Sequence, residues 1–267
     1  MGKAEVRAFW ESNSCGEAYA SGTSLTEQLD AQARSRYALE PYVPAFAKFH
    51  EGRGRDVLEI GTGMGADHFE WSRAAPRRLV GVDLSDRAVR FTQARLRLHG
   101  ATPRLAVSDV EHLPFPAESF DLVYSWGVLH HTPDTRGAVA EVWRVLRRGG
   151  TARVMVYHKY SIVGYLLWLR YAFLAGRPWQ SLAEVYAKHL ESPGTKAYSV
   201  DQGRHLFADF SSVDLRPLLS FSDLLEGHVG QRHRGPGLIA VKACWPRWLI
   251  RRLLSHHGLD LIIEAVK

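Results

Sequence analysis

Residues 55–65, with the sequence Arg-Asp-Val-Leu-Glu-Ile-Gly-Thr-Gly-Met-Gly, constrain the fold of this chain more than any other stretch. Val57, Leu58 and Ile60 predict a short buried strand. Glycines at positions 61, 63 and 65 allow a tight turn and a close approach of the backbone to a ligand. Residues 66–74 can then continue as a helix whose first amides point back at the turn. Together these elements predict a nucleotide-type crevice at the carboxyl edge of a sheet.

The glycine turn alone leaves several functions open. Gly61, Gly63 and Ala66 also match the dinucleotide fingerprint G-x-G-x-x-G/A, so NAD or FAD binding is an alternative. A glycine-rich turn can also be purely structural. The residues that follow it are therefore needed to separate these possibilities.

Composition bounds the class of protein. A chain of 267 residues with two cysteines suits one large domain, or a core domain with a small cap, that needs no disulfides. Cys15 and Cys244 are expected to be packed and inert. The charged N-terminus does not resemble a signal peptide, and the longest apolar stretch, 162–169, is too short to span a bilayer. We therefore expect a cytoplasmic protein without integral membrane association.

The net charge of +6 arises from scattered basic residues. A solvated basic surface is the favoured interpretation, attraction of an anionic substrate is the second, and nucleic-acid binding is the third. We therefore expect no nucleic-acid partner.

Strand and helix patterns alternate five times between residues 57 and 157, which predicts an α/β fold with a doubly wound parallel sheet. The helix predicted at 134–146 is expected to end in a turn at 147–150, and the fifth strand to cover 152–157. Ser85, and Ser199 with Gln202, are predicted to cap helix starts. Asp83 ends the second strand, 22 residues after Gly61, where an acid can accept hydrogen bonds from both ribose hydroxyls of an adenosine. Asp109 follows the third strand and can accept from an adenine amino group, although a turn-capping role is the alternative.

Several motifs, taken together and in order, resemble the class I S-adenosylmethionine-dependent methyltransferases. They are Glu59–Gly65, Val82–Ser85, Ser108–Val110 with Leu113–Phe115, Phe120–Val123, Gly127–His131 and Leu146–Gly150. The resemblance implies S-adenosyl-L-methionine as cofactor. It also implies a Rossmann-like seven-stranded sheet, with five parallel strands and a C-terminal antiparallel pair from residues 213–219 and 259–266. The implied cofactor contacts are Glu59, Gly61, Thr62, Gly63, Gly65, Asp83, Leu84, Asp109, Val110 and Ser125.

The remaining segments are expected to surround this core. Residues 1–50 are predicted to form an N-terminal helical cap on a methyltransferase core of 51–267. Insertions 160–210 and 222–258 are predicted to form a helical substrate lid, with extra core and a solvated basic loop as the alternative. A basic amphipathic helix at 245–254 could also rest on a membrane surface near a lipid-like acceptor. Exposed aromatic residues on the insertions could pair two chains as a homodimer. The candidate substrate contacts are Tyr19, Tyr37, Tyr160 and Arg232.

The predicted reaction is methyl transfer to an oxygen or nitrogen atom of a small-molecule acceptor. Three histidines, His130, His131 and His158, follow strands at the crevice and are candidate general bases. No residue spacing supports a metal site. No Asn-Pro-Pro-Tyr-type motif follows the fourth strand, which argues against nucleobase and glutamine amide acceptors. An NAD(P)-dependent oxidoreductase and a non-catalytic binding module remain the alternatives.

Overall fold

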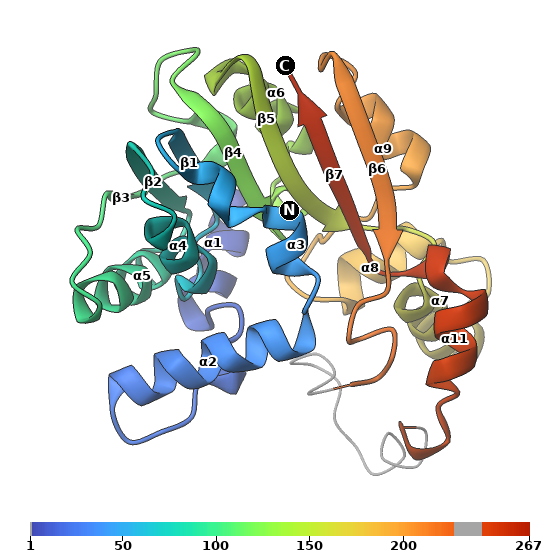
Figure 1. Cartoon of the computed structure of the whole chain (residues 1–267). Helices are drawn as coiled ribbons and strands as arrows, with labels where there is room; N and C mark the ends of the chain where they lie inside the picture. Colours follow the sequence, from blue (N-terminus) through green and yellow to red (C-terminus); the bar gives the residue numbers. More distant parts are fainter. Residues whose placement is uncertain (1, 227–241) are drawn as a thin grey trace.

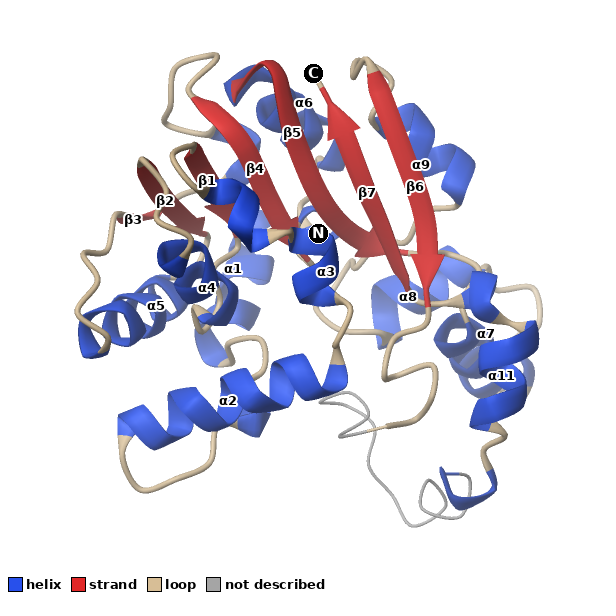
Figure 2. Cartoon of the chain, in the orientation of Figure 1, coloured by secondary structure: helices blue, strands red, loops and turns tan. Residues whose placement is uncertain are grey.

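A computed structural model of the chain describes residues 2–226 and 242–267. Seven strands form one sheet in the order β3-β2-β1-β4-β5-β7-β6 (Figure 2). Strands β1 to β5 pair in parallel, and β7 runs antiparallel between β5 and β6. The predicted doubly wound sheet with a C-terminal antiparallel pair is therefore confirmed. The strands are β1 (Asp56–Ile60), β2 (Arg78–Asp83), β3 (Leu105–Val107), β4 (Phe120–Trp126), β5 (Leu146–Tyr157), β6 (Ser212–Leu218) and β7 (Asp260–Val266).

Helices cover both faces of this sheet (Figure 1). Two predicted helix starts are confirmed by their caps: the Ser85 side chain accepts from the Ala88 amide, and Ser199 forms a capping box with Gln202. The described helices are α1 (Lys3–Ser12), α2 (Leu25–Leu39), α3 (Val43–Ala47), α4 (Ala66–Arg73), α5 (Asp86–Leu98), α6 (Thr135–Val145), α7 (Ile162–Trp168), α8 (Leu182–His189), α9 (Val200–Leu206) and α11 (Arg247–Leu253).

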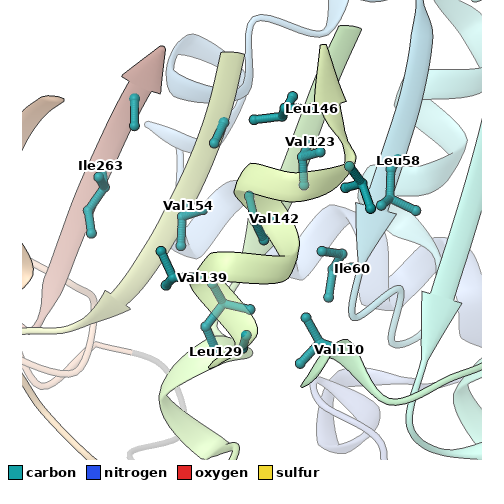
Figure 3. Close-up of a cluster of buried hydrophobic side chains, with 14 of the residues drawn as sticks. Leu58, Ile60, Val110, Val123, Leu129, Val139, Val142, Leu146, Val154 and Ile263 are labelled. Atoms are coloured by element: carbon teal, nitrogen blue, oxygen red, sulfur yellow. The ribbon is translucent and has the colours of Figure 1, made fainter. Parts of the chain in front are cut away.

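The central strands are buried on both faces because helices lie on each side of the sheet. Figure 3 shows Val139 and Val142 of α6 among side chains from β1, β4, β5 and β7. Residues of alternate parity, including Val57 and Tyr124, pack on the other face against the fully buried Trp71 of α4. The crevice edge of the sheet therefore rests on a rigid core.

Strand β5 begins at Leu146, six residues before the predicted start at position 152. The Arg147–Gly150 segment, expected as a turn, belongs to the strand, with a register shift opposite Phe120 and Leu122. Arg147 fixes this extension because its two Nη atoms donate to Asp121 Oδ1 and Asp56 Oδ2 at 2.7 and 2.8 Å. An ion cluster of residues far apart in the sequence therefore sets the start of β5, which the local sequence pattern placed too late.

Asp56 is the centre of this ion cluster. Arg77 donates to both of its carboxylate oxygens, each at 2.8 Å, and Asp56 is only 6% exposed. The hydrogen bonds from Arg77, and next those from Arg147, hold the pKa of Asp56 well below its usual range.

We expect Asp56→Asn to lower the free energy of unfolding by about 1–2 kcal/mol at pH 7. The effect is modest because water reaches the arginine partners and weakens their hydrogen bonds to Asp56. Because the folded-state pKa lies below the unfolded value of about 3.9, the stabilisation is complete above that pH and is lost as pH falls below it. Urea unfolding at pH 7 and pH 3 measures this, with Asp209→Asn, at an exposed position, as a control. Equal pH dependence of the variant and the parent protein would contradict the assignment.

Candidate cofactor and acceptor site

A cavity of about 820 Å³ opens at the carboxyl ends of β1, β2, β4 and β5. This volume lies within the ~300–1,000 Å³ range of small-molecule sites. Its lining combines the glycine turn with distant segments: α1 and the loop after it, residues 126–133, residues 190–191 and residues 259–260. The cavity therefore lies at the edge of the sheet where the sequence predicts the crevice.

The three glycines of the turn have left-handed backbones for different reasons. At Gly61 (φ 82°) an added Cβ would lie 2.1 Å from Val128 Cγ2, and at Gly65 (φ 77°) it would lie 2.8 Å from the Thr92 Cα. At Gly63 (φ 52°) it would meet no protein atom within 4 Å, although Gly63 lines the cavity. Packing therefore requires Gly61 and Gly65, whereas Gly63 leaves a cradle open for a ligand.

Two acids flank this cradle. Asp83 Oδ2 accepts from the Gly63 amide at 3.1 Å, and Oδ1 accepts from the Ser85 amide at 2.9 Å. Burial raises the pKa of Asp83. Asp109 contacts Lys3 Nζ of α1 at 2.6 Å and accepts from the Glu111 amide at 3.0 Å. Both carboxylates line the cavity, together with Leu84 and Val110.

Helix α1 forms one wall of this end of the cavity through Lys3, Val6, Phe9 and Trp10. Polar contacts hold it in place. Lys3 Nζ also pairs with Glu111 at 2.6 Å, and Glu11 accepts from the backbone amides of Asp86 and Arg87 at 2.8 and 3.2 Å. Within the helix itself only Val6 is fully buried.

Comparison with known proteins identifies the core of the chain. Residues 58–154 match the family model described as a methyltransferase domain. Sterol 24-C-methyltransferase of Pneumocystis carinii is 30% identical over 122 residues, covering 45% of this chain and 31% of that protein. Erythromycin 3''-O-methyltransferase of Saccharopolyspora erythraea is 37% identical over 108 residues, covering 38% and 34%. The match thus spans about a third of the length of these curated relatives.

A solved structure resembles almost the whole chain. Phosphoethanolamine N-methyltransferase 2 of Haemonchus contortus, in complex with phosphomonomethylethanolamine and S-adenosylhomocysteine, superposes with a TM-score of 0.64 at 15% identity. The match covers 98% of this chain and 60% of that one. Residues 58–154 of this chain therefore form a methyltransferase domain.

The cavity fits S-adenosylmethionine. The open space beside Gly63 leaves room for a ligand to approach the main chain. Hydrogen bonds from the Gly63 and Ser85 amides fix the orientation of the Asp83 carboxylate. The predicted cofactor residues Glu59, Gly61, Thr62, Gly63 and Gly65 all line the cavity. Their contacts with the cofactor remain a prediction from the family resemblance.

We expect Gly63→Ala to raise the Kd of the methyltransferase for S-adenosylhomocysteine tenfold or more, because the new Cβ would enter the cradle. Its backbone strain should be about 1–2 kcal/mol, as expected for any non-glycine residue at positive φ. Gly100→Ala is a matched control, since Gly100 has φ 72° and open space but lies outside the cavity. Titration calorimetry and melting curves separate the two effects. Equal affinities of the two variants would contradict the assignment.

Glu59 forms a buried pair with His68 behind the turn. The carboxylate Oε2 lies 2.7 Å from His68 Nδ1, and both side chains are almost fully buried. Burial raises the pKa of Glu59 and lowers the pKa of His68 to about 3. A cationic group bound beside Glu59 would favour its ionised form, which suits an ammonium or sulfonium ligand.

The structure places Ser125 outside the cavity lining. Ser125 is fully buried, and its Oγ has no hydrogen-bond partner among the described residues. It shares the face of β4 with Val123, which points to α6, whereas Trp126 and Gly127 line the cavity. Strand parity therefore argues against Ser125 as a cofactor contact.

Of the three predicted histidine bases, His131 alone lines the cavity in the described structure. His131 Nδ1 lies 2.8 Å from Ser192 Oγ and 3.2 Å from Thr195 Oγ1. His131 Nε2 lies 3.4 Å from Glu191 Oε2, and the ring meets Trp10 edge to face. His131 is thus hydrogen-bonded at Nδ1, and its Nε2 faces Glu191 at the boundary of the cavity.

The structure does not bring His130 and His158 to the cavity. His130 is fully buried between the rings of His131 and Tyr157, and burial lowers its pKa well below the usual range. His158 Nδ1 lies 3.1 Å from the Gly258 carbonyl oxygen, and burial lowers its pKa too. Both are packing residues rather than bases facing an acceptor.

The predicted substrate contacts have different positions. Tyr19 lines the cavity. Tyr37 does not, because its hydroxyl donates to Asp67 at 3.0 Å. Tyr160 is 45% exposed on the surface, away from the cavity lining. Arg232 lies outside the described residues. We therefore withdraw Tyr37 and Tyr160 as acceptor contacts.

Sequence reasoning missed several cavity residues from distant segments. Arg36 of α2 donates to both carboxylate oxygens of Asp67 and pairs with Glu40, and these three side chains line the cavity. Glu191, from the end of α8, and Asp260, from the start of β7, lie there too. No local motif marks these residues, because only the fold brings them together.

Cys15 is not packed as the sequence suggested. It lies in the cavity lining and is exposed, as is Cys244. Although solvent reaches Cys15, the cavity wall around it desolvates the thiol and raises its pKa, so the thiol stays protonated at neutral pH.

The described lining of the cavity is acidic. Seven carboxyl side chains face it, against three lysine or arginine side chains, of which Lys3 and Arg36 are already paired with carboxylates. Lining residues of the two insertions include Val163, Leu190 and Glu191 from the first, and Ser222 and Lys242 from the second.

Two further findings apply to residues 2–226 and 242–267. No three or more His, Cys, Asp or Glu side chains are grouped so that they could hold a metal ion. No helix there combines the length and the apolar character that crossing a membrane requires.

Proposed function

We propose that this methyltransferase transfers the methyl group of S-adenosylmethionine to a hydroxyl or amino group of a small molecule, and that the His131–Glu191 pair takes up the acceptor proton. The observation that supports this is the shared cavity: the glycine turn, Asp83, His131 and Glu191 all line it. Because cofactor and acceptor occupy one enclosed space, orientation can contribute up to roughly 7–11 kcal/mol toward the barrier.

The hydrogen bonds around His131 support a base. The Thr195 hydroxyl donates to the Ser192 carbonyl at 2.6 Å, so toward His131 Nδ1 it can only accept. In the proposed arrangement Nδ1 carries the hydrogen and points it at the Ser192 and Thr195 hydroxyl oxygens, so that Nε2 keeps a lone pair. Nε2 has no hydrogen-bond partner among the described residues and faces Glu191 at 3.4 Å.

In the proposed reaction, Glu191 presents its carboxylate to the cavity and accepts the proton of the acceptor O–H or N–H group. The proton then passes to His131 Nε2, and the resulting imidazolium is stabilised by the Glu191 carboxylate. Tyr157, whose hydroxyl donates to Glu191 Oε2 at 2.7 Å, orients that carboxylate. When bound, S-adenosylmethionine supplies a methyl group activated by the sulfonium.

The acidic lining supports a neutral or cationic acceptor over the anionic one that the basic composition suggested. The relatives include proteins named for methylation of a sterol carbon and an erythromycin oxygen, which supports a small molecule but leaves the acceptor atom to experiment. The NAD(P)-dependent oxidoreductase loses its support because the matched domain and the C-terminal strand pair are those of the methyltransferases. We retain a cytoplasmic location as a proposal.

Labelled methyl transfer tests this function. The protein should bind S-adenosylhomocysteine but not NADH by titration calorimetry. It should also transfer label from S-adenosylmethionine to members of a panel of neutral, cationic and anionic hydroxyl and amine compounds, with anionic members the poorest. Binding of NADH alone would overturn the function, and preferred labelling of anionic acceptors would overturn the acceptor class. Cofactor binding without transfer to any acceptor would favour the non-catalytic module.

A further inference from the structure

Exposed apolar side chains gather on two segments of the insertions. Among the described residues, ten of the fourteen exposed large hydrophobic side chains lie in residues 160–179 and 248–254. The most exposed are Phe173, Leu174, Trp179, Trp248 and Leu253, and Trp179 is 78% exposed. Scattered single apolar residues on a surface are ordinary, but a concentration of this kind marks an interaction site.

The two segments form one surface, here called the apolar–basic face. Helices α7 and α11 pack together through Ile162, Leu166 and Ile250. The Tyr165 hydroxyl also lies 3.0 Å from His257 Nδ1, just after α11. Figure 1 shows both helices beyond the ends of β6 and β7, at the opposite end of the molecule from α5.

Each segment repeats its exposed apolar residues at helical spacing. Tyr165, Leu169 and Phe173 follow one another at intervals of four along α7 and the π-helical turn Leu169–Phe173 that continues it. Leu249 and Leu253 have the same spacing on α11. Residues four apart lie on one side of a helix, so each segment presents an apolar stripe outward.

The charged residues within the two segments are all basic. The sequence contains no Asp or Glu from position 159 to 183 or from 243 to 259, and these stretches hold six lysine or arginine residues. Arg247 and Arg251 approach Glu226 at 3.9 and 2.8 Å. The structure shows no ion pair of Arg170, Arg177 or Arg252 with the described residues, and all three are exposed.

We infer that the apolar–basic face docks on an anionic lipid surface. Tryptophan and leucine side chains enter the boundary between head groups and acyl chains, while arginines beside them contact lipid phosphates. A second copy of the chain is the less favourable occupant, because a two-fold interface would bring these arginines against their own copies. A lipid surface supplies the negative charge that this face lacks. Val163 of α7 also lines the cavity, so the face and the cavity share a helix.

Vesicle co-sedimentation of the full chain tests this inference. We expect binding to vesicles of phosphatidylcholine containing about one-third phosphatidylserine, weaker binding to phosphatidylcholine alone, and partial release by salt. The double variant Trp179→Ser/Trp248→Ser should bind the anionic vesicles at least about tenfold more weakly. Trp143→Ser is the matched control, since Trp143 is an exposed tryptophan on α6, away from this face, and should leave vesicle binding unchanged.

Two further measurements make the outcomes decisive. Unchanged affinity of the double variant for S-adenosylhomocysteine would show that it folds, and light scattering would report the oligomeric state. Absence of binding to the anionic vesicles would overturn the inference, as would binding that the double variant retains in full. A dimer that the double variant dissolves, without vesicle binding, would assign the face to a second copy instead. These results do not depend on whether an acceptor for methyl transfer is found.

Discussion

Replacing His131 with alanine is expected to lower kcat by about 10²–10⁴-fold, the usual contribution of a general base. Affinity for S-adenosylhomocysteine should stay within about twofold, because the Gly61–Gly65 turn and Asp83 hold the cofactor end of the cavity. The Glu191→Gln variant should lose a comparable factor, since it removes the carboxylate that lies 3.4 Å from His131 Nε2. Turnover of the acceptor identified by the labelling panel is the measurement.

A pH–rate profile separates a base from a packing residue. If the His131–Glu191 pair takes up the acceptor proton, the parent profile should show an acid limb that both variants lack. His158→Ala is the matched control, because His158 is a buried histidine at a strand end that does not line the cavity. If His131→Ala kept the parent kcat and the same acid limb, proton uptake by His131 would be wrong.

Asp83→Asn is expected to weaken cofactor binding by about 10²–10⁴-fold. A hydrogen bond to a charged group contributes about 1.5–3 kcal/mol, and the family resemblance assigns Asp83 two ribose hydroxyls. The asparagine keeps the size of the side chain and one carbonyl acceptor for the Gly63 or Ser85 amide, so the fold should survive.

Asp86→Asn makes the same charge change three residues away, on the first turn of α5 and outside the cavity, where the side chain is partly exposed. Titration with S-adenosylhomocysteine should show little change in this control. A loss of affinity of similar size in both variants would indicate a long-range charge effect rather than direct contact by Asp83.

The core was predictable because its signals are local. Alternation of apolar strands with amphipathic helices gave the order of β1 to β5, and the glycine turn with Asp83 placed the crevice at their carboxyl ends. Gly63 and Asp83 could be found this way because backbone conformation and strand position determine their place. The start of β5 was missed because the ion cluster of Asp56, Asp121 and Arg147 joins positions far apart in the sequence.

The part of the cavity around His131 and Glu191 was only partly predictable. Which side chains face it depends on the direction of each side chain and on packing between segments far apart in the sequence. Sequence reasoning placed His130, His131 and His158 near the crevice, but the fold turns His131 alone toward it. Glu191 comes from an insertion whose path around the core has no local signal. Tyr37 was predicted wrongly because the local sequence fits an aromatic residue in a lid equally well. Its position is decided by the hydrogen bond from its hydroxyl to the buried Asp67, which the sequence does not reveal.

The attachment of α1 has a kinetic consequence. This helix lines the cavity beside Asp83 and Asp109, the predicted cofactor contacts, and polar contacts hold it there: the Lys3 ion pairs and the amides capped by Glu11. We expect spent cofactor to leave only after these contacts open, so that product release limits steady turnover and a burst precedes it. Because salt weakens ion pairs of partly exposed groups, raising the ionic strength should then quicken the steady rate without changing the burst.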